Sequence, residues 1–373
     1  MDFATKAIHL GHEAEQATGA VSPPIYLTTT FEREPDGSYP RGYVYSRLSN
    51  PNRDALEKCL AALENGAGAA AFSSGLAAIM ALLQALAPGD HVLSSKDLYH
   101  GTVHMFEDIF APWGLTVTFV DTTDLAAIEA AIRPNTKLVF LETPSNPTLK
   151  ITDIAQAAAI AHRAGALVAC DNTWATPVLQ RPLDLGADFV IHSTSKYFGG
   201  HSDVLGGALI SKHNDKFFQK IQMIQRIGGA VPSPFDCWLV LRGVQTMPCR
   251  VQNQTNSAGK IAEFLNQHPQ IEKVYYPGLA SHPGHEIAAR QMSAFGAMMS
   301  FQVRGGKAAA LTLTGNLKII SRATSLGGVE SLIEHRASIE GPGSLTPDNL
   351  LRFSVGLENA DDLIADLTQA LVK

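Results

Sequence analysis

The sequence predicts an α/β protein with a mainly parallel central sheet, an extended N-terminal arm and a small α+β domain at the C-terminal end. Three observations lead to this prediction. Short β-rich runs alternate with helical patterns in the middle of the chain, the first fifty residues show no helical period, and strand spacing becomes mixed after about Arg250. A chain of 373 residues has room for two to three domains, so we assign residues 1–50 to the arm, 51–245 to the α/β domain and 246–373 to the smaller domain.

The arm is predicted from its composition. Residues 21–31 contain two prolines and a run of threonines, and residues 32–45 are rich in Gly, Pro and Tyr. Two interpretations are open for such an extended segment. It reaches a neighbouring subunit, or it wraps around its own.

The α/β domain follows from alternating patterns. Leu56, Leu60 and Leu63 share one face of a helix predicted over residues 52–64, and a buried helix over 76–87 ends at Pro88-Gly89. Further helices are predicted over 124–132 and 154–164, and β-rich runs over 67–72, 91–94, 115–120, 137–141, 166–170 and 188–192. Strands that alternate with helices indicate a sheet covered on both faces.

The C-terminal part has fewer strands. We expect helices over 253–267 and 361–371, and strands over 271–275, 297–303 and 350–355. The last helix places Leu363, Ile364, Leu367 and Leu371 on one face.

The composition excludes several classes of protein. Apolar residues make up 45% of the chain and charged residues 17%, a balance that disordered chains do not have. The net charge of −6 argues against a nucleic-acid partner, because readers of a phosphate backbone carry an excess of basic residues. The longest apolar runs are too short to cross a bilayer, and residues 1–10 lack the apolar core of a signal peptide, so no membrane partner is expected.

The cysteines indicate a reducing compartment. No pair has CxxC spacing, so neither a disulfide framework nor a structural zinc site is expected, and a cytoplasmic location fits. No HExxH motif is present either, and we expect no metal. The four cysteines are Cys59, Cys170, Cys237 and Cys249.

Two polar residues come soon after predicted strands. Asp171 follows the run ALVAC, and Lys196 lies in STSKY, after DFVIH. Ligands of open α/β sheets bind at the carboxyl ends of strands, so both residues are candidates for a site. Taken alone, each has a simpler interpretation, a capping aspartate and a surface lysine. A lysine among hydroxyls can also form a Schiff base with a carbonyl cofactor.

Two further signals complete a pattern. The stretch FSSGL, Phe72 to Leu76, places Ser-Ser-Gly between a strand and a helix, where free N–H groups bind anions. Tyr99 follows another strand and can stack on a planar ring. A phosphate site, an acid for a ring nitrogen, a stacking aromatic and an amine are the parts that pyridoxal 5'-phosphate (PLP) requires.

Longer motifs reveal a resemblance to a known family. They include GAVSPPIYLTTTF, YVYSRLSNPNRDALE, ETPSNPTLKITDI, HSTSKYFGGHSDVLGG, SLGGVESLIEH and LLRFSVGLE, spread over nearly the whole chain. With these motifs the chain resembles the Cys/Met-metabolism PLP enzymes, which catalyse trans-sulfuration. The resemblance implies the aminotransferase-like fold (fold type I), PLP as cofactor and an amino acid as substrate.

The resemblance also implies roles for the cofactor-binding residues. Lys196 matches the Schiff-base lysine and proton carrier, Asp171 the partner of the pyridine nitrogen, and Tyr99 the ring stacker and a second catalytic group. Asn146 matches the residue near the cofactor's phenolic oxygen. The phosphate ligands would be Gly75, Leu76, Ser193 and Ser195.

Other matching residues concern substrate and assembly. Arg352 matches the arginine that holds the substrate α-carboxylate, and Ser325 its helper. Tyr45 and Arg47 match a pair that reaches the cofactor phosphate of the neighbouring subunit. This match favours an arm that crosses to a partner, and implies a homodimer, with a homotetramer usual in the family.

Substrate choice depends on departures from the family pattern. Thr324 stands where γ-synthases and γ-lyases often have Glu, while Leu326 stands where enteric-type β-lyases have Trp. Trp174, within DNTWATP, is similar to what β-lyases have at this place. The family's HPAS stretch is His335-Arg336-Ala337-Ser338 here. We expect γ-elimination or γ-replacement, as in cystathionine γ-synthase or γ-lyase. Cystathionine β-lyase, methionine γ-lyase and O-acylhomoserine sulfhydrylase activities are the alternatives.

Overall fold

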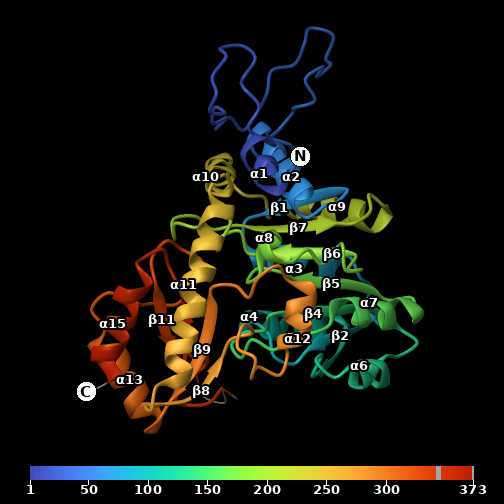
Figure 1. Ribbon diagram of the computed structural model, residues 1–373. Helices are drawn as coiled ribbons and strands as arrows, with labels where there is room; N and C mark the ends of the chain where they lie inside the picture. Colours follow the sequence, from blue (N-terminus) through green and yellow to red (C-terminus); the bar gives the residue numbers. More distant parts are fainter. Residues whose placement is uncertain (342–345, 372–373) are drawn as a thin grey trace.

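Seven strands form the central sheet of the computed structural model, which describes residues 1–341 and 346–371 (Figure 1). The spatial order is β1-β7-β6-β5-β4-β2-β3. Strands β2 to β6 run parallel, and β7 is antiparallel to both of its neighbours. The strands are β1 (Gly68–Phe72), β2 (His91–Ser95), β3 (Thr116–Val120), β4 (Thr136–Glu142), β5 (Leu167–Asp171), β6 (Phe189–His192) and β7 (Gly207–Ser211).

Helices cover both faces of this sheet because alternate strand residues point to opposite sides. Phe140 and Ala169 pack with helices α3 and α9 on one face, while Val139 and Val168 pack with α6 and α7 on the other. The helices up to residue 244 are α1 (Phe3–His9), α2 (Pro51–Leu63), α3 (Gly75–Gln84), α4 (His100–His104), the π-helix η1 (Met105–Phe110), α5 (Ala111–Trp113), α6 (Leu125–Ala131), α7 (Ile154–Arg163), α8 (Thr176–Leu179), α9 (Lys216–Gly228) and α10 (Pro234–Val244).

A second sheet of five strands lies in the C-terminal part, in the order β10-β11-β12-β9-β8. The long helix α11 lies beside it (Figure 1). The strands are β8 (Ile271–Tyr275), β9 (Met298–Val303), β10 (Ser321–Arg322), β11 (Leu332–His335) and β12 (Leu350–Ser354), and the helices are α11 (Met247–Gln267), α12 (His285–Gln291), α13 (Gly306–Asn316), α14 (Arg336–Glu340) and α15 (Ala360–Leu371).

Several predicted bounds differ from the structure. The helix predicted over 76–87 ends at Gln84, before Pro88-Gly89, and the helix predicted to begin at residue 253 begins at Met247. Strands β7 and β11 were not predicted. Both are short: β7 begins at the end of the motif HSTSKYFGGHSDVLGG, and β11 lies within SLGGVESLIEH.

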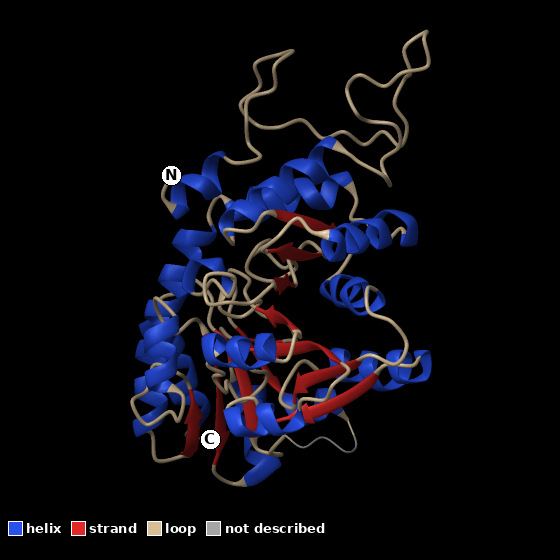
Figure 2. Cartoon of the chain, turned by 90° about the vertical axis from the view of Figure 1, so that its right-hand side faces the viewer, coloured by secondary structure: helices blue, strands red, loops and turns tan. Residues whose placement is uncertain are grey.

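The chain between α1 and α2 projects from the body as two loops (Figure 1, Figure 2). Its main internal link is a bridge between Thr30 and Tyr45, and the side chains of Val21 and Leu27 are 83% and 69% exposed. The predicted extended arm is therefore present after α1, and little of its projecting part packs on the rest of the chain. The predicted bounds of 1–50 are wrong at the start, because residues 3–9 form helix α1 and Ala7 is buried. Helix α2 starts where the arm ends, because Asn50 caps it and Pro51 occupies its first position.

No helix in the described part of the chain is long and apolar enough to span a membrane.

Candidate active site

The carboxyl ends of β2, β4, β5 and β6 meet the start of α3 around a cavity of about 290 Å³. Residues after β10 and β11, together with Arg352 on β12, close it from the smaller sheet. Of the predicted site residues, all except Tyr45 and Arg47 line the cavity: Gly75, Leu76, Tyr99, Asn146, Asp171, Ser193, Ser195, Lys196, Ser325 and Arg352.

The start of α3 forms an anion cradle. Ser74 caps the helix by accepting a hydrogen bond from the N–H of Ala77. The N–H groups of Gly75 and Leu76 lie in the first turn, where no helical carbonyl precedes them, so they can bind an anion. A Cβ on Gly75 would lie 3.0 Å from the Cβ of Ser193, and one on Gly207 would lie 2.1 Å from the carbonyl oxygen of Ser74. Glycine is therefore required at position 207, and a side chain at position 75 would be in tight contact with Ser193.

The two serines after β6 differ in their contacts. The hydroxyl of Ser195 donates to the carbonyl of Gly206 at 3.2 Å and accepts from the N–H of the same residue at 2.9 Å. Ser193 uses its N–H to bond Thr173 and faces Gly75 with its side chain. The hydroxyl of Ser193 is thus the better placed of the two to bind an anion, and Ser195 holds the neighbouring loop.

Two carboxylates lie side by side at the ends of β4 and β5, because Glu142 and Asp171 are partners in the sheet register. Burial raises the pKa of Asp171, although a hydrogen bond from the N–H of Thr173 at 2.9 Å opposes this. Burial and the nearby charge of Asp171 raise the pKa of Glu142 further. Glu142 accepts a hydrogen bond from the N–H of Tyr99 at 2.9 Å, which orients the start of α4. A cationic ring N–H would satisfy Asp171 in this setting.

The amine of Lys196 donates to the hydroxyl of Ser325 at 2.6 Å. Burial, and next the charge of Arg352, lower the pKa of Lys196 to about 8, while Glu334 acts in the opposite direction. Ser325 has a φ of 91°, a strained conformation for a residue other than glycine. Backbone strain of this kind is typical of functional sites, so it supports the assignment of Ser325 to the active site.

Arg352, on β12, is nearly buried and held on several sides. It donates to the side chain of Asn146 and to the carbonyl of Ser325, each at 3.2 Å, and it pairs with Glu334. Its guanidinium carbon lies 5.9 Å from the ring centroid of Trp174. Burial lowers the pKa of Arg352 to about 10, so it stays cationic at neutral pH.

Sequence reasoning missed several cavity residues. Glu142 ends a strand just as Asp171 does, and this position was the available signal. Thr173 and Arg336 also line the cavity, and Glu334 pairs with Arg352 from behind it. Only the fold reveals these residues, because they reach the site from separate elements.

Tyr45 and Arg47 lie on the arm, outside the cavity of their own chain. Arg47 donates to the carbonyl of Arg226 at 2.7 Å, at the end of α9.

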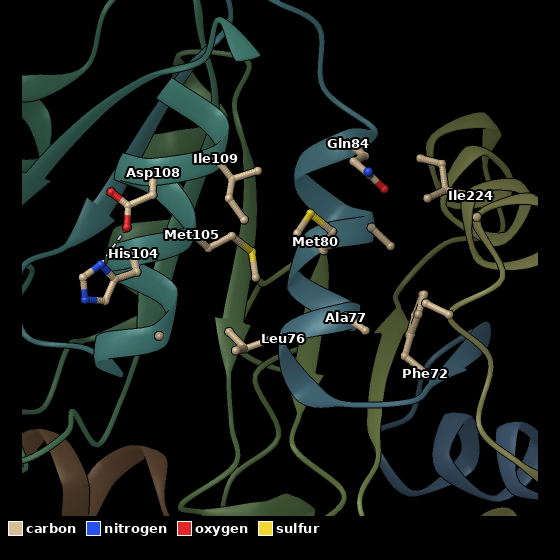
Figure 3. A pocket seen from close by; sticks show the side chains of 14 residues that line it. Phe72, Leu76, Ala77, Met80, Gln84, His104, Met105, Asp108, Ile109 and Ile224 are labelled. Carbon is tan, nitrogen blue, oxygen red and sulfur yellow. Dashed lines mark hydrogen bonds and ion pairs between the residues drawn. The ribbon is translucent and has the colours of Figure 1, made fainter. Parts of the chain in front are cut away.

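A groove of about 490 Å³ adjoins the cavity and shares Leu76 with it. Figure 3 shows Met80 of α3 facing Met105 and Ile109 of η1 across this mainly apolar groove. Ile109 is 47% exposed.

The cavity residues fit PLP. The cradle at α3 suits a phosphate, the buried Asp171 suits a protonated ring nitrogen, and the amine of Lys196 suits an aldehyde. Fold and cavity together define an enzyme that works with a phosphorylated aromatic aldehyde.

Curated relatives agree with this class. The chain is 49% identical over 374 residues to the cystathionine gamma-synthase of Mycobacterium tuberculosis, which covers 99% of this chain and 96% of the relative. It is 46% identical to the cystathionine beta-lyase of Lactococcus lactis, over 99% of this chain and 98% of the relative.

Solved structures agree as well. metB from Corynebacterium glutamicum matches with a TM-score of 0.97 and 44% identity, over 100% of this chain and 98% of that one. The cystathionine gamma-lyase from Lactobacillus plantarum, complexed with L-serine, matches with a TM-score of 0.95 and 43% identity. This match covers 100% of this chain and 99% of that one.

A family model described as Cys/Met metabolism PLP-dependent enzyme matches residues 4–372. The chain therefore belongs to this family of PLP-dependent enzymes. The predictions of fold type I, of PLP as cofactor and of a trans-sulfuration enzyme of the cystathionine γ-synthase and γ-lyase class are confirmed.

Proposed function

We propose that this enzyme breaks or replaces the bond at Cγ of an amino acid derived from homoserine, as cystathionine γ-synthases and γ-lyases do. The observation that carries the proposal is the arrangement on one cavity wall. There Ser325 binds the amine of Lys196 through its hydroxyl and the guanidinium of Arg352 through its carbonyl. One residue thus places a base and a carboxylate-binding group next to each other.

The residues divide the work as follows. Arg352 binds the substrate α-carboxylate, while its contact with Glu334 holds the guanidinium in place. Lys196 removes the α-proton, because its lowered pKa leaves a fraction of neutral amine at neutral pH. When bound, PLP supplies an electron sink for the charge left at the α-carbon. Asp171 would hold a proton at the ring nitrogen, which sustains this electron sink, and Tyr99 would pack against the ring.

The choice between Cγ and Cβ rests on the wall around Ser325. Leu326 and Thr324 line the cavity, and neither brings the indole expected of an enteric-type β-lyase. Trp174 also lines it and favours the second candidate, β-elimination from cystathionine. Thr324 offers a hydroxyl where a carboxylate would bind a distal ammonium, so we expect broad specificity with some β-elimination.

Product analysis tests this proposal. With cystathionine, cleavage at Cγ yields cysteine and 2-oxobutanoate, and cleavage at Cβ yields homocysteine and pyruvate. With an O-acylhomoserine and cysteine, γ-replacement yields cystathionine. Dominant pyruvate and homocysteine, with no consumption of any acylhomoserine, would replace the proposal by the β-lyase alternative.

We also propose that the arm completes the site of a second copy of the chain. Tyr45 and Arg47 lie outside their own cavity on a segment with exposed Val21 and Leu27, and the apolar groove in Figure 3 opens beside the cradle. An isolated chain would leave these apolar surfaces in water. The assembly is then at least a homodimer, and a homotetramer is expected by analogy with the family.

A cytoplasmic location is proposed on the cysteines. Cys59, Cys170 and Cys237 are buried, Cys249 is exposed, and all four are free thiols. Free exposed thiols fit a reducing compartment.

A further inference from the structure

Arg336 is a buried arginine on the wall of the active-site cavity, at the first position of α14. Its side chain is 4% exposed. Nε donates to Glu340 at 2.9 Å and Nη1 donates to Glu334 at 3.1 Å. Nη2 makes no hydrogen bond to any residue within 1–341 or 346–371. Two glutamates therefore fix the guanidinium plane, and one of its NH₂ groups has no acceptor from the described chain.

The proposed function accounts for the other charges that line the cavity. Among the described residues these are Lys196, Arg352, Asp171 and Glu142, besides Arg336. Lys196 serves the cofactor and the α-proton, Arg352 the α-carboxylate and Asp171 the ring nitrogen. Glu142 accepts from Tyr99, and its raised pKa favours the neutral acid. Arg336 is the cation that this mechanism does not use.

The position of Arg336 relative to Arg352 is also fixed. The same oxygen of Glu334, Oε1, binds Nη1 of Arg336 and Nη2 of Arg352. One carboxylate thus joins the two guanidinium groups at the cavity wall. A rigid pair of arginines with a shared counterion suits a ligand with two anionic groups, because little ordering is needed on binding.

A purely structural role for Arg336 is the alternative. Such an arginine would only neutralise Glu334 and Glu340, and its removal would harm every substrate equally. The geometry favours a binding role, because Nε and Nη1 are bonded while Nη2 has no acceptor among the described residues, and the side chain lines the cavity.

We propose that Arg336 is a specificity-determining residue that binds a second anionic group, carried by the leaving group of the substrate. The inference rests on the proposed γ-replacement and names its substrate class, homoserine esters with an anionic acyl or phosphoryl group. A neutral ester would leave Nη2 without its acceptor.

The test compares esters that share the homoserine part and the Cγ–O bond. O-succinyl-L-homoserine and O-phospho-L-homoserine carry an extra negative charge, and O-acetyl-L-homoserine does not. With L-cysteine as second substrate, we expect kcat/KM of the wild type to be about tenfold or more higher for an anionic ester. Whether the succinyl or the phospho ester is preferred distinguishes a carboxylate from a phosphate ligand.

Variants of Arg336 then test the residue itself. Arg336→Gln should lower the ratio of anionic to neutral ester by about tenfold to a hundredfold, the cost of one charge-assisted hydrogen bond. Arg336→Lys keeps the charge beside Glu334 and Glu340, so its ratio of anionic to neutral ester should lie between those of the wild type and Arg336→Gln. The ratio does not depend on the folded fraction, so a poorly folding variant remains informative. Arg290, on α12 and paired with Asp153, provides the control Arg290→Gln, with an unchanged ratio.

The outcomes separate this inference from the proposed function. A wild type without preference, or a ratio that Arg336→Gln leaves unchanged, overturns the role of Arg336. If cystathionine is cleaved at Cγ but no ester reacts, the γ-chemistry stands and the role of Arg336 is overturned. If cystathionine yields only pyruvate and homocysteine and no ester reacts, both proposals are wrong.

Discussion

At the scale of single residues, the chemistry depends on a buried amine. The amine of Lys196 donates a hydrogen bond to the hydroxyl of Ser325 and lies near the charge of Arg352. Burial disfavours its cationic form, which is the physical reason why a lysine can act as a base here. Neither a surface lysine nor a buried one without polar partners would combine reactivity with fixed orientation.

Replacing Lys196 removes this amine. Lys196→Ala should abolish turnover and remove the visible absorbance that the bound cofactor shows when it is linked to the protein. Absorbance spectra and product assays of the purified variant measure both effects. Lys216→Ala, on the exposed face of α9, is the control and should behave as wild type. Full turnover in the Lys196 variant would refute the assignment.

The lowered pKa of Lys196 predicts a pH dependence. Only the neutral amine reacts with an aldehyde, so enzyme stripped of PLP should reload faster as pH rises through about 8. Below that pH the amine is protonated and reloading slows. Arg352 lowers this pKa and Glu334 raises it, so Arg352→Gln should move the midpoint up and Glu334→Gln should move it down. The return of visible absorbance after PLP addition reports the rate, and equal midpoints in all three proteins would contradict the explanation.

At the scale of elements, the start of α3 is shaped by the strand beside it. Strand β7 runs against β1, and Gly207 lies against the backbone of Ser74 and Gly75. The packing of β7 against the first turn of α3 therefore fixes the position of the anion cradle.

A side chain at Gly207 should disturb that cradle. In Gly207→Ala the new Cβ meets the backbone of Ser74 and Gly75 at 2.1 to 2.5 Å, so the first turn of α3 must shift. We expect PLP affinity to fall by about tenfold or more, the size of one lost charge-assisted bond to phosphate. Titration of the stripped enzyme with PLP measures the affinity. Gly259→Ala is the matched control, because no atom lies within 4 Å of its new Cβ, and it should leave PLP binding unchanged.

At the scale of the whole molecule, the projecting arm is the segment that we propose completes the site of a second chain. The arm projects from the body (Figure 2). It carries Tyr45 and Arg47, and neither residue lines the cavity of its own chain. A second chain that receives the arm would gain an arginine for the phosphate. On this proposal, the active site is completed only in an assembly of two chains.

Subunit mixing tests the shared site. Arg47→Ala should weaken PLP retention, because one charge-assisted bond contributes on the order of 1.5–3 kcal/mol. Mixtures of Arg47→Ala with Lys196→Ala should regain activity, since one kind of site in the mixed dimer has both wild-type residues. Activity assays after mixing, with subunit exchange verified by mass, measure the rescue. Exchange without rescue would show that each chain completes its own site.

Much of the fold and of the site could be predicted from the sequence. The helix with Leu56, Leu60 and Leu63 on one face shows its period directly, and Asp171 and Lys196 are conspicuous because they follow apolar strands. Glu334 and Arg336 could not be identified in this way. They become site residues only when β11 pairs with β12 and places Glu334 opposite Arg352.

The sequence by itself determined strands β1 to β6, helices α2, α3, α6 and α7, the family and the residues that match its motifs. These features are local, because hydrophobic period, capping residues and short motifs act over a few neighbouring positions. The tertiary structure decided which of these residues share a cavity and which charges they meet there. The pKa of Lys196, the raised pKa of Glu142 and the joined pair Arg336 and Arg352 depend on burial and on contacts between distant segments. Desolvation and Coulomb interactions act through space, so only the packed chain determines them.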